Sequence, residues 1–331
     1  MDTQLSATST DGSLLWTTDD LGRQITQEKT RGDVIRGMIP TASVNIAVGE
    51  SGLGKSPLMY DLCIRVAASL PFVGFEVASG PTVMMDFENG AERHAVCETL
   101  IRTAGLKRAP QDFYHDPEPG QDLEKKIRAF RPRLVVIDSL RMFAPEALKP
   151  DGVEAAKMLK RLQALAHNQS TSFILIHHVR KEDRKAKPAD LAATPVLEWL
   201  QEASGSRSFI NQTDTRIAIA HDRNSRNGEE CLILKYFMKL RGEFGPIHIE
   251  RMFQQSQAVG YRRLTGKSLL RNSEHEKWFD NLPEHFRHGE AERITGKHSG
   301  ALSHFLKKCD AAGILEKTAS GYRKIDQGQI H

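Results

Sequence analysis

The stretch that decides the fold is GESGLGKS, which spans Gly49–Ser56. It fits the pattern G-x-x-x-x-G-K-[ST] in full, with an apolar strand predicted before it over 43–50 and a helix after it over 56–70. Glycines let backbone N–H groups point inward at phosphate oxygens, and the N-terminus of the following helix adds positive potential. The stretch therefore predicts a loop that cradles nucleotide phosphates inside an α/β fold.

Individual side chains of the loop have separate expected roles. Lys55 should reach the β- and γ-phosphates, and Ser56 should bind Mg²⁺. Pro57 falls in the first turn of the helix, where its missing N–H costs little. A chance glycine loop is the alternative, which the full motif in this context disfavours. The candidate nucleotide-binding residues are Gly49, Glu50, Ser51, Gly52, Leu53, Gly54, Lys55, Ser56 and Pro57.

Apolar runs alternate with helical patterns as far as residue 178. Further strands are predicted within 80–90, 131–140 and 171–178, and further helices over 122–130 and 152–169. Nearly continuous apolar strands alternating with helices are typical of a parallel sheet covered on both faces. From about residue 213 strand-like runs joined by short turns follow, so the parallel sheet is expected to end in antiparallel hairpins.

The chain of 331 residues is long enough for more than one domain. We predict an N-terminal tail over 1–28, an α/β domain over 29–253, a linker over 254–271 and a small unit over 272–331. Residues 261–331 hold 13 Lys and Arg against 9 Asp and Glu. This excess fits a polyanionic partner, although a solvated surface explains it equally well.

The cellular setting is expected to be the cytoplasm. The cysteines, Cys63, Cys97, Cys231 and Cys309, are far apart and form no CxxC pair, which indicates a reducing compartment without disulfides or zinc. The first residues carry neither a basic n-region nor an apolar h-region. No apolar run approaches the roughly 18 residues of a membrane span, so no membrane partner is expected.

Several predicted strands end in side chains suited to phosphate chemistry. Asp138 could hold the water shell of Mg²⁺, or simply cap the next turn. Glu88, two residues after Asp86, could deprotonate an attacking water; the alternative is a pair of polar residues at a strand–loop junction. His177 and His178 reach the carboxyl edge of the sheet, where ligands bind. We expect His178 to contact the γ-phosphate and His177 to be a core residue.

The segments GESGLGKS, TVMMDFENG, RLVVIDSLRMF and FILIHHVRK occur in this order. Together they resemble the RecA-like ATPases, most closely the RepA-type plasmid replicative helicases of the DnaB superfamily, over about 30–253. The resemblance implies a RecA-like core in which Glu88 is the catalytic base, Asp138 the Mg²⁺-associated acid and His178 the γ-phosphate sensor. It also implies ATP and Mg²⁺ as cofactors, a homo-oligomeric, hexameric ring with ATP between subunits, and single-stranded DNA in the pore.

Such a ring needs an arginine supplied by the neighbouring subunit. FMKLRGEFG resembles the K-x-R-x-G stretch of DnaB-like proteins, which implies Arg241 as this finger and Lys239 as its companion; a surface arginine at a hairpin turn is the alternative. Arg207 is a second candidate. The chain departs from the RepA-type pattern at Asp214, where an arginine is expected, with Arg216 close by.

The segment that follows the histidine strand is expected to be a loop in the central pore. A run of charged residues is usually only a solvated loop. Because this run directly follows the histidine strand, contact with DNA phosphates is an equally good interpretation. The candidate contacts are Arg180, Lys181, Arg184, Lys185 and Lys187.

The C-terminal unit has a local pattern of its own. The apolar face of one helix is expected to comprise Leu302, Phe305, Leu306, Cys309 and Ala312, with Gly313 ending the helix and two short strands around 319–321. This pattern resembles a winged helix, with the two strands as the wing, that binds duplex DNA or, alternatively, protein. The candidate DNA contacts are Ser299, Ser303, Lys307, Lys317, Arg323 and Lys324.

The combined prediction is a Mg²⁺- and ATP-dependent, ring-forming DNA helicase or translocase in the replication of a mobile element, plasmid or phage. One alternative is a DNA-bound ATPase that acts as a loader, recombination mediator or regulatory switch without unwinding. The other is a non-enzymatic DNA-binding regulator whose loop only senses nucleotide. A small-molecule kinase is disfavoured because the chain shows no lid segment.

Overall fold

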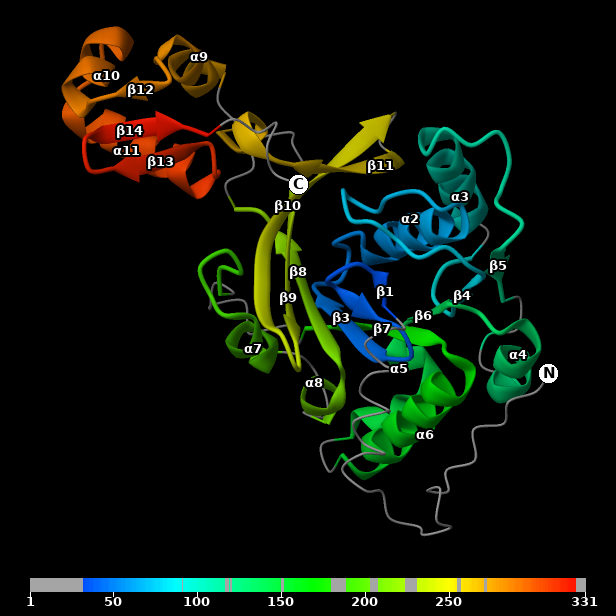
Figure 1. The fold of residues 1–331 in the computed structure, drawn as a ribbon. Coiled ribbons are helices and arrows are strands. Elements are labelled where there is room, and N and C mark those ends of the chain that lie inside the picture. The colour runs from blue at the N-terminus through cyan, green and yellow to red at the C-terminus, as the bar shows by residue number, and fades with distance from the viewer. Residues whose placement is uncertain are drawn as a thin grey trace, which may run out of the picture.

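The computed structural model describes residues 32–90, 92–116, 119, 121–149, 152–179, 189–202, 208–223, 231–254, 257–270 and 273–325. Its centre is a nine-stranded sheet in the order β11-β10-β9-β8-β3-β7-β6-β4-β5 (Figure 1). Parallel pairing joins β3 (Val44–Gly49), β4 (Thr82–Asp86), β5 (Phe113–His115), β6 (Leu134–Asp138), β7 (Ser172–His178) and β8 (Thr215–His221). Antiparallel pairing adds β9 (Cys231–Met238), β10 (Gly242–Gln254) and β11 (Gln257–Leu264). The predicted RecA-like architecture is confirmed.

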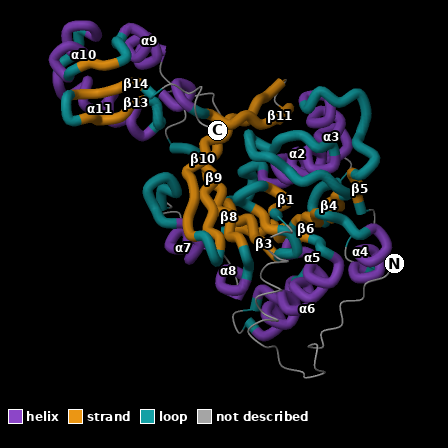
Figure 2. Tube along the Cα trace, viewed as in Figure 1, coloured by secondary structure: helices purple, strands orange, loops and turns teal. Residues whose placement is uncertain are grey.

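Helices cover both faces of this sheet (Figures 1 and 2). One face carries α2 (Lys55–Ala67) and α3 (Glu92–Thr103). The other face carries α4 (Leu123–Phe130), α5 (Leu140–Phe143), α6 (Val153–Gln169), α7 (Val196–Trp199) and α8 (Ser208–Gln212), with the 3₁₀ turns η1 (Pro145–Leu148) and η2 (Leu200–Glu202). A small hairpin of β1 (Asp33–Ile35) and β2 (Ile39–Pro40) precedes the sheet.

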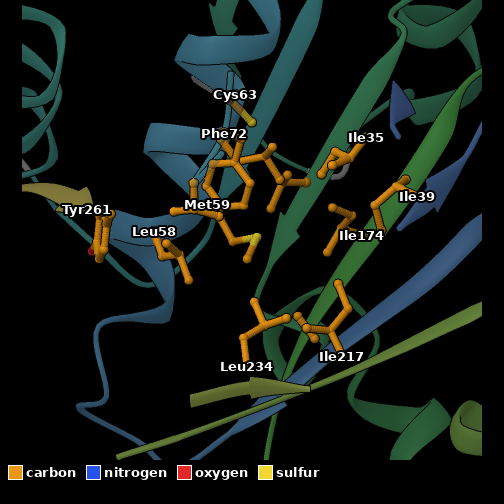
Figure 3. Close-up of a cluster of buried hydrophobic side chains, with 14 of the residues drawn as sticks. Ile35, Ile39, Leu58, Met59, Cys63, Phe72, Ile174, Ile217, Leu234 and Tyr261 are labelled. Atoms are coloured by element: carbon orange, nitrogen blue, oxygen red, sulfur yellow. The ribbon is translucent and has the colours of Figure 1, made fainter. Parts of the chain in front are cut away.

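The alternation of side chains along each strand divides the interior into two cores. On β6, Leu134 and Val136 point to the core beneath α2, whereas Val135 and Ile137 point to the core beneath α6. Figure 3 shows the first of these cores, in which Leu58 and Met59 of α2 pack against strand residues such as Ile174. Because both faces are buried, the strands read as continuous apolar runs in the sequence.

The structure corrects the predicted linker over 254–271. Residues 257–264 form β11, an edge strand that pairs with β10, and Tyr261 and Leu264 are buried. Its exposed Arg262 and Arg263 are typical of an edge strand, where charge opposes pairing with other chains. The polar composition that suggested a linker is therefore a property of the sheet edge.

The C-terminal unit is a separate small fold with its own core. It contains η3 (Gly266–Leu270), α9 (Ser273–Asn281), α10 (His288–Thr295) and α11 (Ser299–Ala311), with a sheet in the order β12 (His285–Phe286), β14 (Gly321–Lys324) and β13 (Leu315–Thr318). On α11, Leu302, Phe305, Leu306 and Cys309 are buried, as predicted, and Gly313 follows the helix end with φ 66°. None of the helices formed by the described residues has the length and apolarity that crossing a bilayer requires.

Candidate active site

Strand register brings the four sequence motifs to the carboxyl edge of the sheet. Gly49 at the end of β3 lies opposite His178 at the end of β7, and Asp86 at the end of β4 lies opposite Asp138 at the end of β6. Because β7 lies between β3 and β6, these residues line one continuous edge. This is the edge at which open α/β sheets bind ligands.

The loop between β3 and α2 has the backbone geometry that a phosphate cradle needs. Gly52 and Gly54 have φ values of 79° and 86°, in the left-handed region that favours glycine. Gly49 is fixed by packing instead, since a Cβ atom there would lie 2.5 Å from the carbonyl oxygen of Ile219 on β8. Gly54 precedes Lys55, the first residue of α2, so the N-terminus of this helix opens toward the loop.

Lys55 folds back over the loop. Its Nζ atom donates to the carbonyl oxygens of Gly49 at 2.9 Å and Glu50 at 2.5 Å, and lies 3.2 Å from Nδ1 of His178. Burial lowers the pKa of the ammonium to about 8, against the opposing effect of Asp138. The charge is therefore held on main-chain oxygens that phosphate oxygens can replace.

Asp138 and Ser56 fit a Mg²⁺ ion. The Ser56 hydroxyl hydrogen-bonds to the Asp138 carboxylate, which is buried, and burial raises the pKa of this carboxyl to about 7. Among the described residues no donor reaches Asp138 Oδ2, which leaves one buried oxygen for a metal-bound water. The described residues contain no cluster of three His, Cys, Asp or Glu side chains for a metal, so a bound Mg²⁺ would depend on phosphates and water.

Glu88 lies on the exposed side of the same edge. Its Oε1 accepts a hydrogen bond from the Ser139 hydroxyl and lies 3.9 Å from Nε2 of His178. Since Nδ1 of His178 faces the Lys55 ammonium, the neutral ring carries its proton on Nε2 and directs it toward Glu88. Burial lowers the pKa of His178, and Lys55 lowers it further. Glu88, His178 and Lys55 thus form one connected set of polar groups.

The two remaining carboxyl-edge candidates have internal roles. Asp86 is buried and accepts hydrogen bonds from the loop that follows it. His177 is buried and lies against the ring of Phe209, in agreement with the expectation that it is a core residue. Two groups of predicted residues lie outside the described part of the chain: Arg207, and the loop residues Arg180, Lys181, Arg184, Lys185 and Lys187.

Arg241 and Lys239 lie at the opposite, amino edge of the sheet. They belong to the β9–β10 turn, and Met238 before this turn pairs with Thr215 at the start of β8. Arg241 Nη1 lies 2.9 Å from Asp33 Oδ2, and half of the arginine side chain is exposed. Leu240 between the two cations is 95% exposed. The turn cannot reach the phosphate loop of its own subunit, because the length of the sheet separates them.

The departure at Asp214 has a structural explanation. Asp214 Oδ2 accepts a hydrogen bond from the backbone N–H of Val44, at the start of β3. Arg216 is buried and donates to the carbonyl oxygens of Ile210 and Asn211. Both side chains therefore hold the amino edge of the sheet together, and Arg216 is not available to a neighbouring subunit.

Two contacts to the phosphate loop were not predicted from the sequence. The Arg251 guanidinium of β10 packs over Gly54, where an added Cβ atom would lie 2.9 Å from the arginine Cζ, and it donates to the carbonyl oxygen of Leu53. The Tyr261 hydroxyl of β11 donates to the Gly54 carbonyl oxygen at 3.4 Å. Nothing in the local sequence marks these residues, since they reach the loop only when β10 and β11 join the sheet.

The predicted DNA contacts of the C-terminal unit differ in availability. Lys307 and Lys317 are exposed, and Arg323 forms a surface ion pair with Glu316 at 2.6 Å. Lys324 is different: its ammonium donates to the carbonyl oxygen of Leu282 and lies over the Phe279 ring. These internal contacts of the Lys324 ammonium argue against its predicted contact with phosphate. Ser299 is exposed at the start of α11, and the Ser303 hydroxyl lies 3.2 Å from Nε2 of His288.

Comparison with known proteins agrees with this geometry. A family model described as an AAA domain matches residues 13–184, which is just over half of the chain and includes the phosphate loop, Glu88, Asp138 and His178. No curated protein matches the chain. The matched region contains β3, β4, β6 and β7, the strands that form the carboxyl edge. The chain therefore belongs to the AAA domain family of P-loop ATPases.

Proposed function

We propose that this chain is a ring-forming, Mg²⁺- and ATP-dependent DNA helicase or translocase that acts in the replication of a mobile element, plasmid or phage. The observation that carries the proposal is the division of the ATPase groups between the two edges of one sheet. Lys55, Asp138 and Glu88 gather at the carboxyl edge, whereas Arg241 lies at the amino edge. A finger on the far edge can serve only the site of a neighbouring subunit.

Within such a site each group has a defined task. Lys55 would leave the Gly49 and Glu50 carbonyl oxygens to neutralise the β- and γ-phosphates. Asp138 and Ser56 would hold the bound Mg²⁺, which supplies charge neutralisation for the phosphates. Glu88 would take the proton of the attacking water, and His178 would donate from Nε2 toward the γ-phosphate. The partner's arginine would stabilise the transition-state charge.

Mixing of two inactive variants tests the intersubunit site. R241A and K55A should each lack ATPase activity, and an equal mixture should recover about a quarter of wild-type activity, because one interface in four then combines an intact lysine with an intact arginine. R262A is a matched control, since Arg262 is an exposed β11 arginine paired with Glu250. Failure to recover activity, with subunit exchange verified by native mass spectrometry, would contradict Arg241 as the finger.

The C-terminal unit supports a role on DNA. The proposal that it is a winged helix is supported by its helices and its β12-β14-β13 sheet, and Ser299, Ser303 and Lys307 recur at helical spacing on one side of α11. We therefore include duplex DNA among the proposed partners, beside single-stranded DNA in the pore.

Strand displacement on a forked duplex separates the proposed function from its closest alternative. Unwinding that requires ATP supports a helicase. ATP turnover stimulated by DNA without unwinding would instead support a loader, recombination mediator or switch. Absence of turnover in the presence of Mg²⁺ and DNA would support the nucleotide-sensing regulator.

A further inference from the structure

We infer that Tyr60 and Asp86 are positioning residues that set the place of the Glu88 carboxylate. This inference rests on the proposed function, in which Glu88 accepts the proton of water. Glu88 lies beyond the end of β4 and is exposed, so the strand itself does not fix its position. What fixes it is the buried carboxylate of Asp86, two residues earlier.

The Asp86 carboxylate organises the whole turn that carries Glu88. Its Oδ1 atom accepts hydrogen bonds from the backbone N–H groups of Glu88 at 3.0 Å and Asn89 at 2.9 Å. The Asn89 side-chain amide donates to both carboxylate oxygens, at 3.1 and 2.9 Å. A carboxylate offers only acceptors, so it can receive all these donors at once. These hydrogen bonds to Asp86 therefore fix the conformation of the turn after β4.

Tyr60 holds the other side of this carboxylate. Its hydroxyl donates to Asp86 Oδ2 at 2.7 Å and lies 3.1 Å from Nε2 of His115 on β5. Because the hydroxyl proton is used toward Asp86, the histidine Nε2–H is the donor in the second contact. Tyr60 is buried in α2, the helix that begins at the phosphate loop. The Glu88 turn is thereby tied to the element that carries Lys55.

The consequence for catalysis is a rigid distance between the base and the phosphates. Glu88 accepts from Ser139 and faces His178, and both contacts depend on the turn keeping its shape. A misplacement of about 1 Å at a reacting group can reduce rate about 10²-fold. Asp86 therefore contributes through the backbone of the turn that carries Glu88.

The test combines Y60F with a matched control, Y236F. Tyr236 is buried in the same core and stacks on Phe244, and four strands of the sheet separate its strand, β9, from β4, which the Glu88 turn follows. Y60F should lower kcat about tenfold, the effect of one hydrogen bond to a charged group, while KM and the Kd for MgADP stay within about twofold. The exposed N89A variant should give a smaller loss, about threefold, without risk to folding. Y236F should leave all these constants unchanged.

A second readout does not depend on turnover. Hydrogen exchange at the amides of Glu88 and Asn89 should accelerate in Y60F and N89A but not in Y236F, because these amides donate to Asp86. Adding Y60F to E88Q should slow the enzyme no further than E88Q alone. Tyr60 acts by placing the Glu88 carboxylate, and E88Q has already removed that carboxylate. Unchanged exchange in Y60F, or an unchanged kcat with accelerated exchange, would overturn the inference. A wild-type chain without turnover would contradict the proposed function, and exchange would still decide whether Tyr60 and Asp86 fix the turn.

Discussion

The carboxyl edge of the sheet and the C-terminal unit differ in the burial of their charged side chains. At the edge, Lys55 and Asp138 are buried, and their pKa values move to about 8 and about 7. In the C-terminal unit, Lys307, Lys317 and Arg323 are exposed, and Arg323 forms a surface ion pair with Glu316. Exposed pairs are worth little and exchange readily, whereas a buried charge acts only through fixed partners.

The difference predicts how each region responds to substitution. Buried groups that share partners should behave as one unit, so that a single change removes function. Exposed charges should act nearly additively and should weaken with salt. Substitutions at the edge and removal of the C-terminal unit test this contrast, from the largest expected effect to the smallest.

Lys55→Ala should reduce ATP hydrolysis to background. Its ammonium is the buried cation at the loop, held by Gly49 and Glu50, and Ala leaves the β- and γ-phosphates without that charge. Lys55→Met is the matched control, because it keeps the apolar stem and removes only the charge. Phosphate release assays should give the same null result for both variants. Substantial turnover by K55M would mean that the buried charge is not the essential feature.

Glu88→Gln should slow hydrolysis by about 10²–10⁴-fold, because an amide keeps the shape but cannot accept a proton. Binding of MgADP should be unchanged, since Glu88 contacts Ser139 and His178 and lies outside the phosphate loop. Single-turnover kinetics measures the chemical step directly. A rate within a factor of about two of wild type would exclude Glu88 as the base.

Asp138→Asn should give a chain that is more stable but inactive. Burial raises the folded-state pKa of Asp138 to about 7. The unfolded value is about 3.9, so the stabilising contribution of this carboxyl is fully present below about pH 4 and is lost as the pH rises through about 7. Asn cannot ionise, so we expect D138N to be about 1–4 kcal/mol more stable than wild type at pH 8 and nearly equal at pH 4. Urea unfolding without nucleotide or Mg²⁺ measures this difference. A less stable D138N at pH 8 would contradict burial as the cause.

Removal of residues 265–331 should leave ATP hydrolysis without DNA close to normal. The cut falls after β11, and the C-terminal core lies beyond it. Duplex binding should weaken, with a loss in salt slope of roughly 0.9 per phosphate contact removed. Salt titration of both chains measures this slope. Equal slopes and affinities would mean that the unit binds protein or packs on the core.

The sequence predicted the carboxyl edge well for a physical reason. Each motif ends an apolar strand, and parallel strands end at one edge, so Gly49, Glu88, Asp138 and His178 were expected to meet without knowledge of the strand order. The helix α11 was equally predictable, because its apolar spacing and Gly313 are local signals.

Contacts between distant segments could not be predicted in this way. Arg251 of β10 contacts Gly54 of the phosphate loop, and Tyr60 of α2 donates to Asp86 at the end of β4. No pattern in the sequence around these residues indicates either contact. The edge strand β11 reads as a linker in the sequence because its Arg262 and Arg263 are polar residues that face solvent. Its Arg262 and Arg263 belong to the ATPase sheet, so part of the positive charge of residues 261–331 lies outside the C-terminal unit.

The first glycine of the phosphate loop has a consequence for the evolution of such chains. A Cβ atom at Gly49 would lie 2.5 Å from the Ile219 carbonyl oxygen, so this glycine is required by the sheet whether or not nucleotide binds. Descendants that lose ATP hydrolysis should therefore keep Gly49, while Lys55 and Glu88 become free to drift. A glycine at this position in a chain that lacks the lysine and the glutamate would therefore indicate the fold of that chain. It would not indicate that the chain hydrolyses ATP.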